Sequence, residues 1–284
     1  MPLDLLSTLL RGLGFIAILQ AGGALLFVAL LGTRLAKTRR AILQLARMAA
    51  ASGTVLLIAQ YVTEPARMAG ALSGVMDAGL HGYLLHTRTA LVMGLRLGGL
   101  LLAWLALRNE GAWVRGLGTM AAMLIAASFA TTGHTAQNPL WWWLTPLLTI
   151  HVLIVQFWFG SLLPLLQVVR RESPSTAALI VQRFSGLAAW SVPVILVAGL
   201  LMAAGLLPNA AALGQPYGIG LLIKILAFAA LMALAATNKL RLGPALAQDS
   251  TAAARLRFNI GLEFVLIAAV LMGTAALTTF WSPE

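Results

Sequence analysis

Eight long apolar runs fill most of this sequence and constrain its fold more than any other feature. A helix needs about 20 apolar residues to cross the hydrocarbon core of a bilayer. Runs of about that length recur along the chain, with most charged residues between them. We therefore expect an all-α, polytopic helical bundle in a lipid bilayer. The expected membrane-spanning helices are 12–32, 43–63, 89–107, 116–135, 144–168, 184–207, 218–237 and 259–280.

The composition supports the same interpretation. The chain of 284 residues is 60% hydrophobic and only 10% charged, whereas soluble domains carry about 25% charged residues. A formal net charge of +11 would suggest a nucleic acid partner for a soluble protein. Here the positions of the charges explain it better, so we expect no nucleic acid partner. The chain has no cysteine, which excludes disulfides and thiolate metal sites.

The basic residues predict the orientation of the bundle. Fourteen of the 19 lysine and arginine residues lie in or beside every second connection. Short cytoplasmic loops are enriched in these residues. We therefore expect these connections to face the cytoplasm and both termini to be periplasmic, in a bacterial inner membrane. The fourteen are Arg34, Lys37, Arg39, Arg40, Arg47, Arg108, Arg115, Arg170, Arg171, Arg183, Lys239, Arg241, Arg255 and Arg257.

All four histidines fall on the predicted outer side. His81 and His86 lie in the connection 64–88, which we expect to be irregular or partly helical. His134 ends the fourth expected helix, and His151 lies about 10 Å deep in the fifth, at 1.5 Å per residue. Because a short loop joins these two helices, they should be antiparallel neighbours. The four imidazoles are therefore candidates for a shared metal or cofactor site, with separate structural roles as the alternative.

The outer connection offers further metal-ligating atoms. Asp77 and His81 are four residues apart, so on a helix their side chains would share one face. Met76 adds a soft thioether, which suits Cu(I), while imidazole suits both copper oxidation states. On an irregular loop, a spacing of four residues would not bring the two side chains to one face.

Besides Arg47, which belongs to the basic set above, three charged residues fall inside the expected helices, where charges are costly and usually functional. We expect Arg96 to meet Glu64, Asp77 or a bound anion. Glu263 is expected at the inner rim, paired with Arg257, Lys239 or Asn238. Lys224 should lie at a different depth from Glu263, so these two are not expected to pair.

Several segments in the second half of the chain resemble the CopD/PcoD copper resistance protein D family. They cover about 116–284, so we divide the chain into an N-terminal part, 1–115, with three helices and the loop 64–88, and a CopD-like part, 116–284, with five. In the first part the resemblance rests mainly on the span pattern and the outer histidines. The segments are Gly133-His134, His151 to Pro164 with Trp158 and Gly160 between, Arg183-Phe184-Ser185, Tyr217-Gly218 with Lys224 after it, Asn238 to Pro244, and Arg257 to Glu263.

The resemblance implies an inner-membrane protein that takes copper from the periplasmic side toward the cytoplasm. It also implies a small periplasmic copper-binding partner of the CopC type. Carried over to this sequence, His134 and His151 would be membrane copper ligands. Asp77, His81, His86 and Met76 would then capture the copper ion outside.

Two other functions stay open at this stage. A membrane b-type cytochrome would ligate one haem through two histidines on neighbouring helices, with Arg96 and Lys224 near the propionates. A copper-delivery factor for respiratory oxidase assembly would use the same ligands without net transport. We do not expect an enzyme, because the sequence has no Gly-x-Ser-x-Gly, His-Glu-x-x-His or P-loop pattern.

Overall fold

The computed structural model describes residues 2–109, 111–131, 134–206 and 214–280. In this part of the chain, eight helices are long and apolar enough to cross a membrane, as predicted. The described residues contain no β-strand, which confirms the all-α class. The long helices are α1 (Pro2–Leu31), α2 (Arg39–Ala69), α4 (Arg88–Arg108), α5 (Ala112–Ala130), α7 (Trp141–Arg171), α8 (Pro174–Leu206), α9 (Pro216–Thr237) and α11 (Ser250–Phe280).

Most of these helices extend beyond the predicted apolar segments. Helix α7 has 31 residues, and a rise of 1.5 Å per residue makes it about 46 Å long. The hydrocarbon core of a bilayer is about 30 Å thick. The ends of α7 therefore reach the interfacial layers, where Trp141 and Trp142 are exposed at one end. Aromatic side chains of this kind are typical of that layer.

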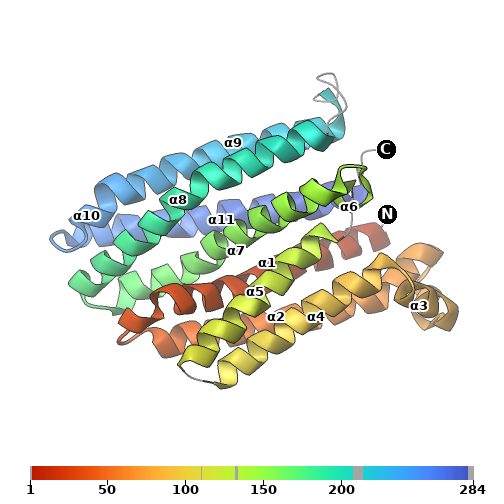
Figure 1. The fold of residues 1–284 in the computed structure, drawn as a ribbon, viewed down its shortest axis with the longest axis horizontal. Helices are drawn as coiled ribbons and strands as arrows, with labels where there is room; N and C mark the ends of the chain where they lie inside the picture. Colours follow the sequence, from red (N-terminus) through yellow and green to blue (C-terminus); the bar gives the residue numbers. More distant parts are fainter. Residues whose placement is uncertain (1, 110, 132–133, 207–213, 281–284) are drawn as a thin grey trace.

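Helix α1 forms the centre of the bundle. It packs against α2, α5, α7 and α11, and its residues from Phe15 to Val28 are almost all buried. Figure 1 shows α1 and α7 running between the α2–α4–α5 group and the α8–α9 pair. One hydrophobic core contains residues from both predicted parts of the chain, including Phe27 of α1 and Phe159 of α7. The Phe159 ring in turn stacks on Phe264 of α11, with centroids 4.8 Å apart.

The short elements gather at the two ends of the bundle. Helix α1 begins and α11 ends at the same end of the molecule, where α3 (Ala78–Leu85) and α6 (His134–Gln137) also lie (Figure 1). The connection 64–88 is partly helical, as expected, because it contains α3 and the 3₁₀ turn η2 (Leu72–Met76). The opposite end carries η1 (Gly32–Arg34), the π-helical turn η4 (Asn238–Leu242) and α10 (Gly243–Ala245). We call these the histidine end and the basic end.

Candidate functional site

The elements that carry the four histidines lie at or near the histidine end. His81 lies in α3, His86 follows α3 as its C-cap residue, and His134 begins α6. His151 lies in α7, ten residues after Trp141 begins that helix. The side chain of His134 is outside the described residues, so the predicted pairing of His134 with His151 stays a prediction.

Asp77 and His81 each have a local partner in the outer connection. Asp77 is the N-cap of α3, and its Oδ1 accepts a hydrogen bond from the Leu80 N–H at 3.0 Å. The Nε2 atom of His81 lies 2.9 Å from the Val75 carbonyl. Because that carbonyl can only accept, Nε2 carries a proton, and in the neutral ring Nδ1 therefore keeps its lone pair. A histidine held in this way by a backbone carbonyl has the arrangement that metal-ligating histidines usually show.

The other outer candidates are surface residues. The Met76 side chain is 86% exposed, and His86 and Asp77 are exposed as well. Within the described ranges, no three His, Asp or Glu side chains come together as a metal site. An ion held at this end by described residues would therefore have fewer than three of these side chains as ligands.

His151 turns its ring toward α8. The ring lies against the backbone of Ile195, and a Cβ atom on Gly199 would be 3.9 Å from its Cε1. Its Nδ1 is buried and has no hydrogen-bond partner. Lys224 of α9 is close enough to His151 to act on it electrostatically. His151 thus offers an unpaired nitrogen inside the bundle, with a positive charge nearby.

Arg96 does not meet the carboxylates that we expected. Its Nε donates a hydrogen bond to the Ser128 hydroxyl at 3.2 Å. Its guanidinium carbon lies 5.3 Å from the Phe15 ring centre and 4.9 Å from that of Phe129. Contacts of this length allow cation–π attraction. The expectation of a carboxylate partner was wrong because position along the sequence indicates how deep a residue lies, but not toward which neighbouring helix its side chain points.

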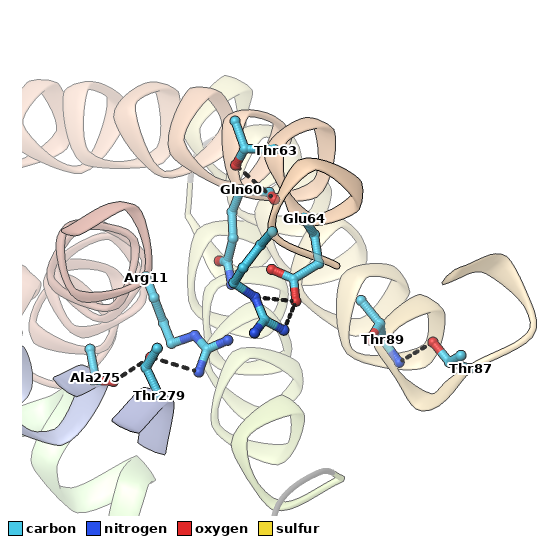
Figure 2. Close-up of polar contacts among 9 residues, drawn as sticks. Arg11, Gln60, Thr63, Glu64, Thr87, Thr89, Ala275 and Thr279 are labelled. Atoms are coloured by element: carbon cyan, nitrogen blue, oxygen red, sulfur yellow. Dashed lines mark hydrogen bonds and ion pairs between the residues drawn. The ribbon is translucent and has the colours of Figure 1, made fainter. Parts of the chain in front are cut away.

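Glu64 already has a basic partner from its own helix. Arg67 donates to its carboxylate from Nε at 3.0 Å and forms an ion pair with it. Figure 2 shows Arg11 pointing to Thr279, with a hydrogen bond of 3.2 Å that joins α1 to α11. The Arg11 contact ties α1 to α11 at the histidine end, whereas the pair of Arg67 and Glu64 stays within α2. No pattern in the sequence pointed to the contact between Arg11 and Thr279.

Glu263 has one of the partners that we expected. Its Oε1 accepts a hydrogen bond from the Asn238 amide at 2.6 Å. Its Oε2 accepts a second from the Trp158 indole N–H at 3.2 Å. Trp158 was not foreseen as a partner, because it lies on α7, far away in the sequence.

The fold and these residues define a multi-pass helical membrane protein with polar groups inside the bundle. Residues 178–277 match the family described as Copper resistance protein D. The matched region covers most of α8 together with α9 and most of α11, and there it confirms the resemblance to this family. The match relates the chain to membrane proteins of copper resistance. No match was found among curated proteins or among solved structures.

Proposed function

We propose that this protein passes copper ions through the inner membrane, from the periplasmic side toward the cytoplasm. The family match over residues 178–277 is the observation that carries the proposal. It is supported by the position of the histidine-bearing elements at the end opposite the basic connections. That arrangement suits capture of a cation on the less basic side.

Sparse ligands suit a cargo ion. A protein that transfers an ion has to release it from each binding site along the route, so each site must bind weakly enough for the ion to leave. Closed sites with four protein ligands are typical of structural metals instead. In our proposal His81 and His86 capture copper outside together with Asp77 and Met76, and His134 and His151 pass it on. A CopC-like periplasmic protein would supply the copper ion.

In this route the unpaired Nδ1 of His151 is the copper-binding atom that lies deeper in the bundle. Lys224 opposes a cation there, because like charges repel strongly in a medium of low dielectric constant. Lys224 therefore acts as a barrier that limits how long copper stays on His151. Replacing it with leucine, which has neither charge nor sulfur, is expected to strengthen copper retention by about tenfold, the factor that corresponds to 1.4 kcal/mol.

The decisive experiment is copper uptake into vesicles with and without the protein. The double variant His134→Ala/His151→Ala should lose most of the uptake, because both membrane ligands are removed. Gln137→Ala is a matched control, since Gln137 is exposed in the same short helix as His134. Equal uptake with and without the protein would exclude transfer, and unchanged uptake in the double variant would exclude this route. A Soret band in the purified protein would favour the cytochrome instead.

A further inference from the structure

Glu263 is a carboxyl group buried inside α11. Its side chain is only 3% exposed, and both of its oxygens accept hydrogen bonds, from Trp158 and from Asn238. In the described part of the chain, no lysine, arginine or histidine lies within ion-pair distance of it. A carboxyl group inside a membrane helix is costly and in transport proteins often serves as a proton site.

An irregular turn places Asn238 beside this carboxyl group. Residues Asn238–Leu242 form a π-helical turn at the end of α9, and such turns are frequent at functional sites. Asn238 also accepts a hydrogen bond from the Asn259 amide at 2.9 Å. The two asparagines and Glu263 therefore form one continuous hydrogen-bonded chain, from Asn259 through Asn238 to the carboxyl group.

Hollows lie at both ends of this chain. A cavity of about 350 Å³ is lined by Glu263, Trp158, Asn238 and Lys239, and its remaining wall is mostly apolar. A shallower hollow of about 510 Å³ is lined by Asn259 together with Arg241 and Arg255, at the basic end. A water molecule takes about 30 Å³ of liquid volume, so the first cavity has room for several. Its polar groups supply the partners that water needs there.

The charges around Glu263 are few. In the described part of the chain, Lys239 is the one other charged residue that lines its cavity. Helices α7 and α8 contribute uncharged side chains, among them Trp158, Phe184 and Ser185, and α9 contributes Met232. An ionised Glu263 would therefore give this cavity its negative charge, and a protonated Glu263 would leave it without one.

We propose that Glu263 is a proton-exchange site open to the basic end of the bundle, and that it gives up its proton as a copper ion passes to that side. The link to copper rests on the proposed function, whereas the proton exchange itself does not. In this step the carboxyl O–H bond breaks, the proton goes to water in the cavity, and the negative carboxylate offsets the charge of the passing cation. A proton returns from the same side once the ion has left. No oxidant or reductant is required.

The isosteric variant Glu263→Gln tests the role of the proton, because glutamine has nearly the same shape as glutamate but cannot exchange a proton. Glutamine can still accept from Trp158 through its amide oxygen. The Asn238 amide can rotate so that its oxygen accepts from the glutamine NH₂ group, and the Asn259 amide can rotate so that its oxygen accepts from the Asn238 NH₂ group, so the hydrogen-bonded chain survives with its direction reversed. A matched control is Glu172→Gln, which removes a carboxylate at the basic end but outside the membrane-spanning helices.

Infrared difference spectra of the purified protein, recorded between high and low pH without copper, test the proton site directly. The wild-type protein and Glu172→Gln should show the carbonyl stretch of a buried, protonated carboxyl group at low pH, and Glu263→Gln should lack it. The band should appear at a higher pH in Trp158→Phe, which retains the carboxyl group but removes one of its donors. A wild-type protein without this band, or a band that persists in Glu263→Gln, would overturn the proton site.

Copper transfer into vesicles tests the coupling. Lowering the pH on the basic side should slow transfer by the wild-type protein and by Glu172→Gln. Glu263→Gln should transfer copper roughly tenfold more slowly, as the loss of about one charge–charge interaction predicts, and without pH dependence. A pH dependence that persists in Glu263→Gln would overturn the coupling. If the wild-type protein moves no copper while the infrared band is present, the proposed function fails and the proton site stands.

Discussion

Gly23 of α1 and Gly160 of α7 are so close that a Cβ atom on Gly23 would lie 2.6 Å from the Cα atom of Gly160. Side chains near this contact are polar, and the Gln20 amide donates a hydrogen bond to the Gly160 carbonyl at 2.9 Å. Small residues let membrane helices approach closely, and interhelical hydrogen bonds then add to the packing. This contact holds α7, which carries His151, against the central helix of the bundle.

We predict that Gly160→Ala destabilises the protein substantially. The added methyl group would overlap the α1 backbone at Gly23, where no flexible side chain can give way. Overpacking of this kind costs about 1–3 kcal/mol, and sometimes more. The measurement is the midpoint of thermal unfolding in a mild detergent, with size-exclusion chromatography as the readout.

Gly14→Ala is the matched control in α1, because nothing lies within 4 Å of a Cβ atom at that position. It should leave the midpoint unchanged or raise it slightly, since alanine is favoured over glycine in a helix by about 1 kcal/mol. Equal midpoints for Gly160→Ala and the wild-type protein would show that α1 and α7 are not packed as closely as described.

The number of helices could be predicted from the sequence, but their ends could not. Each apolar run is long enough to cross the bilayer, and burial of backbone polar groups in lipid leaves a helix as the natural solution. The helical backbone then continues past the apolar residues, as in α2, which runs from Arg39 to Ala69 instead of 43–63. The end of an apolar segment is therefore not by itself the end of the helix, which can continue into the interfacial layer.

The contacts of the buried polar residues were predicted less well. Glu263 and Asn238 were expected together because both were placed toward the inner end of the bundle, and their contact is confirmed. Arg96 was placed wrongly because its partners, Ser128 and two phenylalanine rings, depend on how α4 is rotated against α5 and α1. Rotation of this kind is decided by packing, which a single sequence does not reveal.

Arg96 and Ser128 should be energetically coupled. Ser128→Ala leaves the Nε–H of the buried Arg96 without its partner, and an unsatisfied buried donor costs about 1–3 kcal/mol. Arg96→Met leaves no such group, because the Ser128 hydroxyl still donates to the Ile125 carbonyl at 2.6 Å. Ser128→Ala should therefore cost much less in the Arg96→Met background.

A double-mutant cycle on thermal midpoints measures this coupling. The four proteins needed are the wild type, each single variant and the double variant, all in one detergent. Purely additive effects would contradict the contact between the two side chains.

Glu172 should make stability depend on pH. Its Oε1 accepts hydrogen bonds from the Lys37 and Thr38 backbone N–H groups, both at 2.9 Å, and from the Thr38 hydroxyl at 2.7 Å. Partial burial opposes ionisation of this carboxyl group, but these hydrogen bonds outweigh it and lower its pKa. Because the folded pKa is below the unfolded one, the stabilisation is present at neutral pH and is lost as the pH falls through the folded pKa.

Glu172→Gln should therefore be less stable than the wild-type protein at pH 7. The difference should be no more than about 1 kcal/mol, since solvent reaches the carboxylate. Thermal midpoints of the two proteins should converge as the pH is lowered toward the acidic range. A constant difference at every pH would show that the charge of Glu172 contributes nothing.

The orientation of the bundle can be tested with two serine-to-cysteine variants, because the natural chain has no cysteine. Ser73 is exposed in η2 at the histidine end, and Ser175 is exposed at the start of α8 at the basic end. If the basic connections face the cytoplasm, a membrane-impermeant maleimide should label Ser73→Cys in intact spheroplasts. It should label Ser175→Cys only after the membrane is permeabilised. The reverse pattern would place His81 and His86 in the cytoplasm, and copper capture from the periplasm by these histidines would then be impossible.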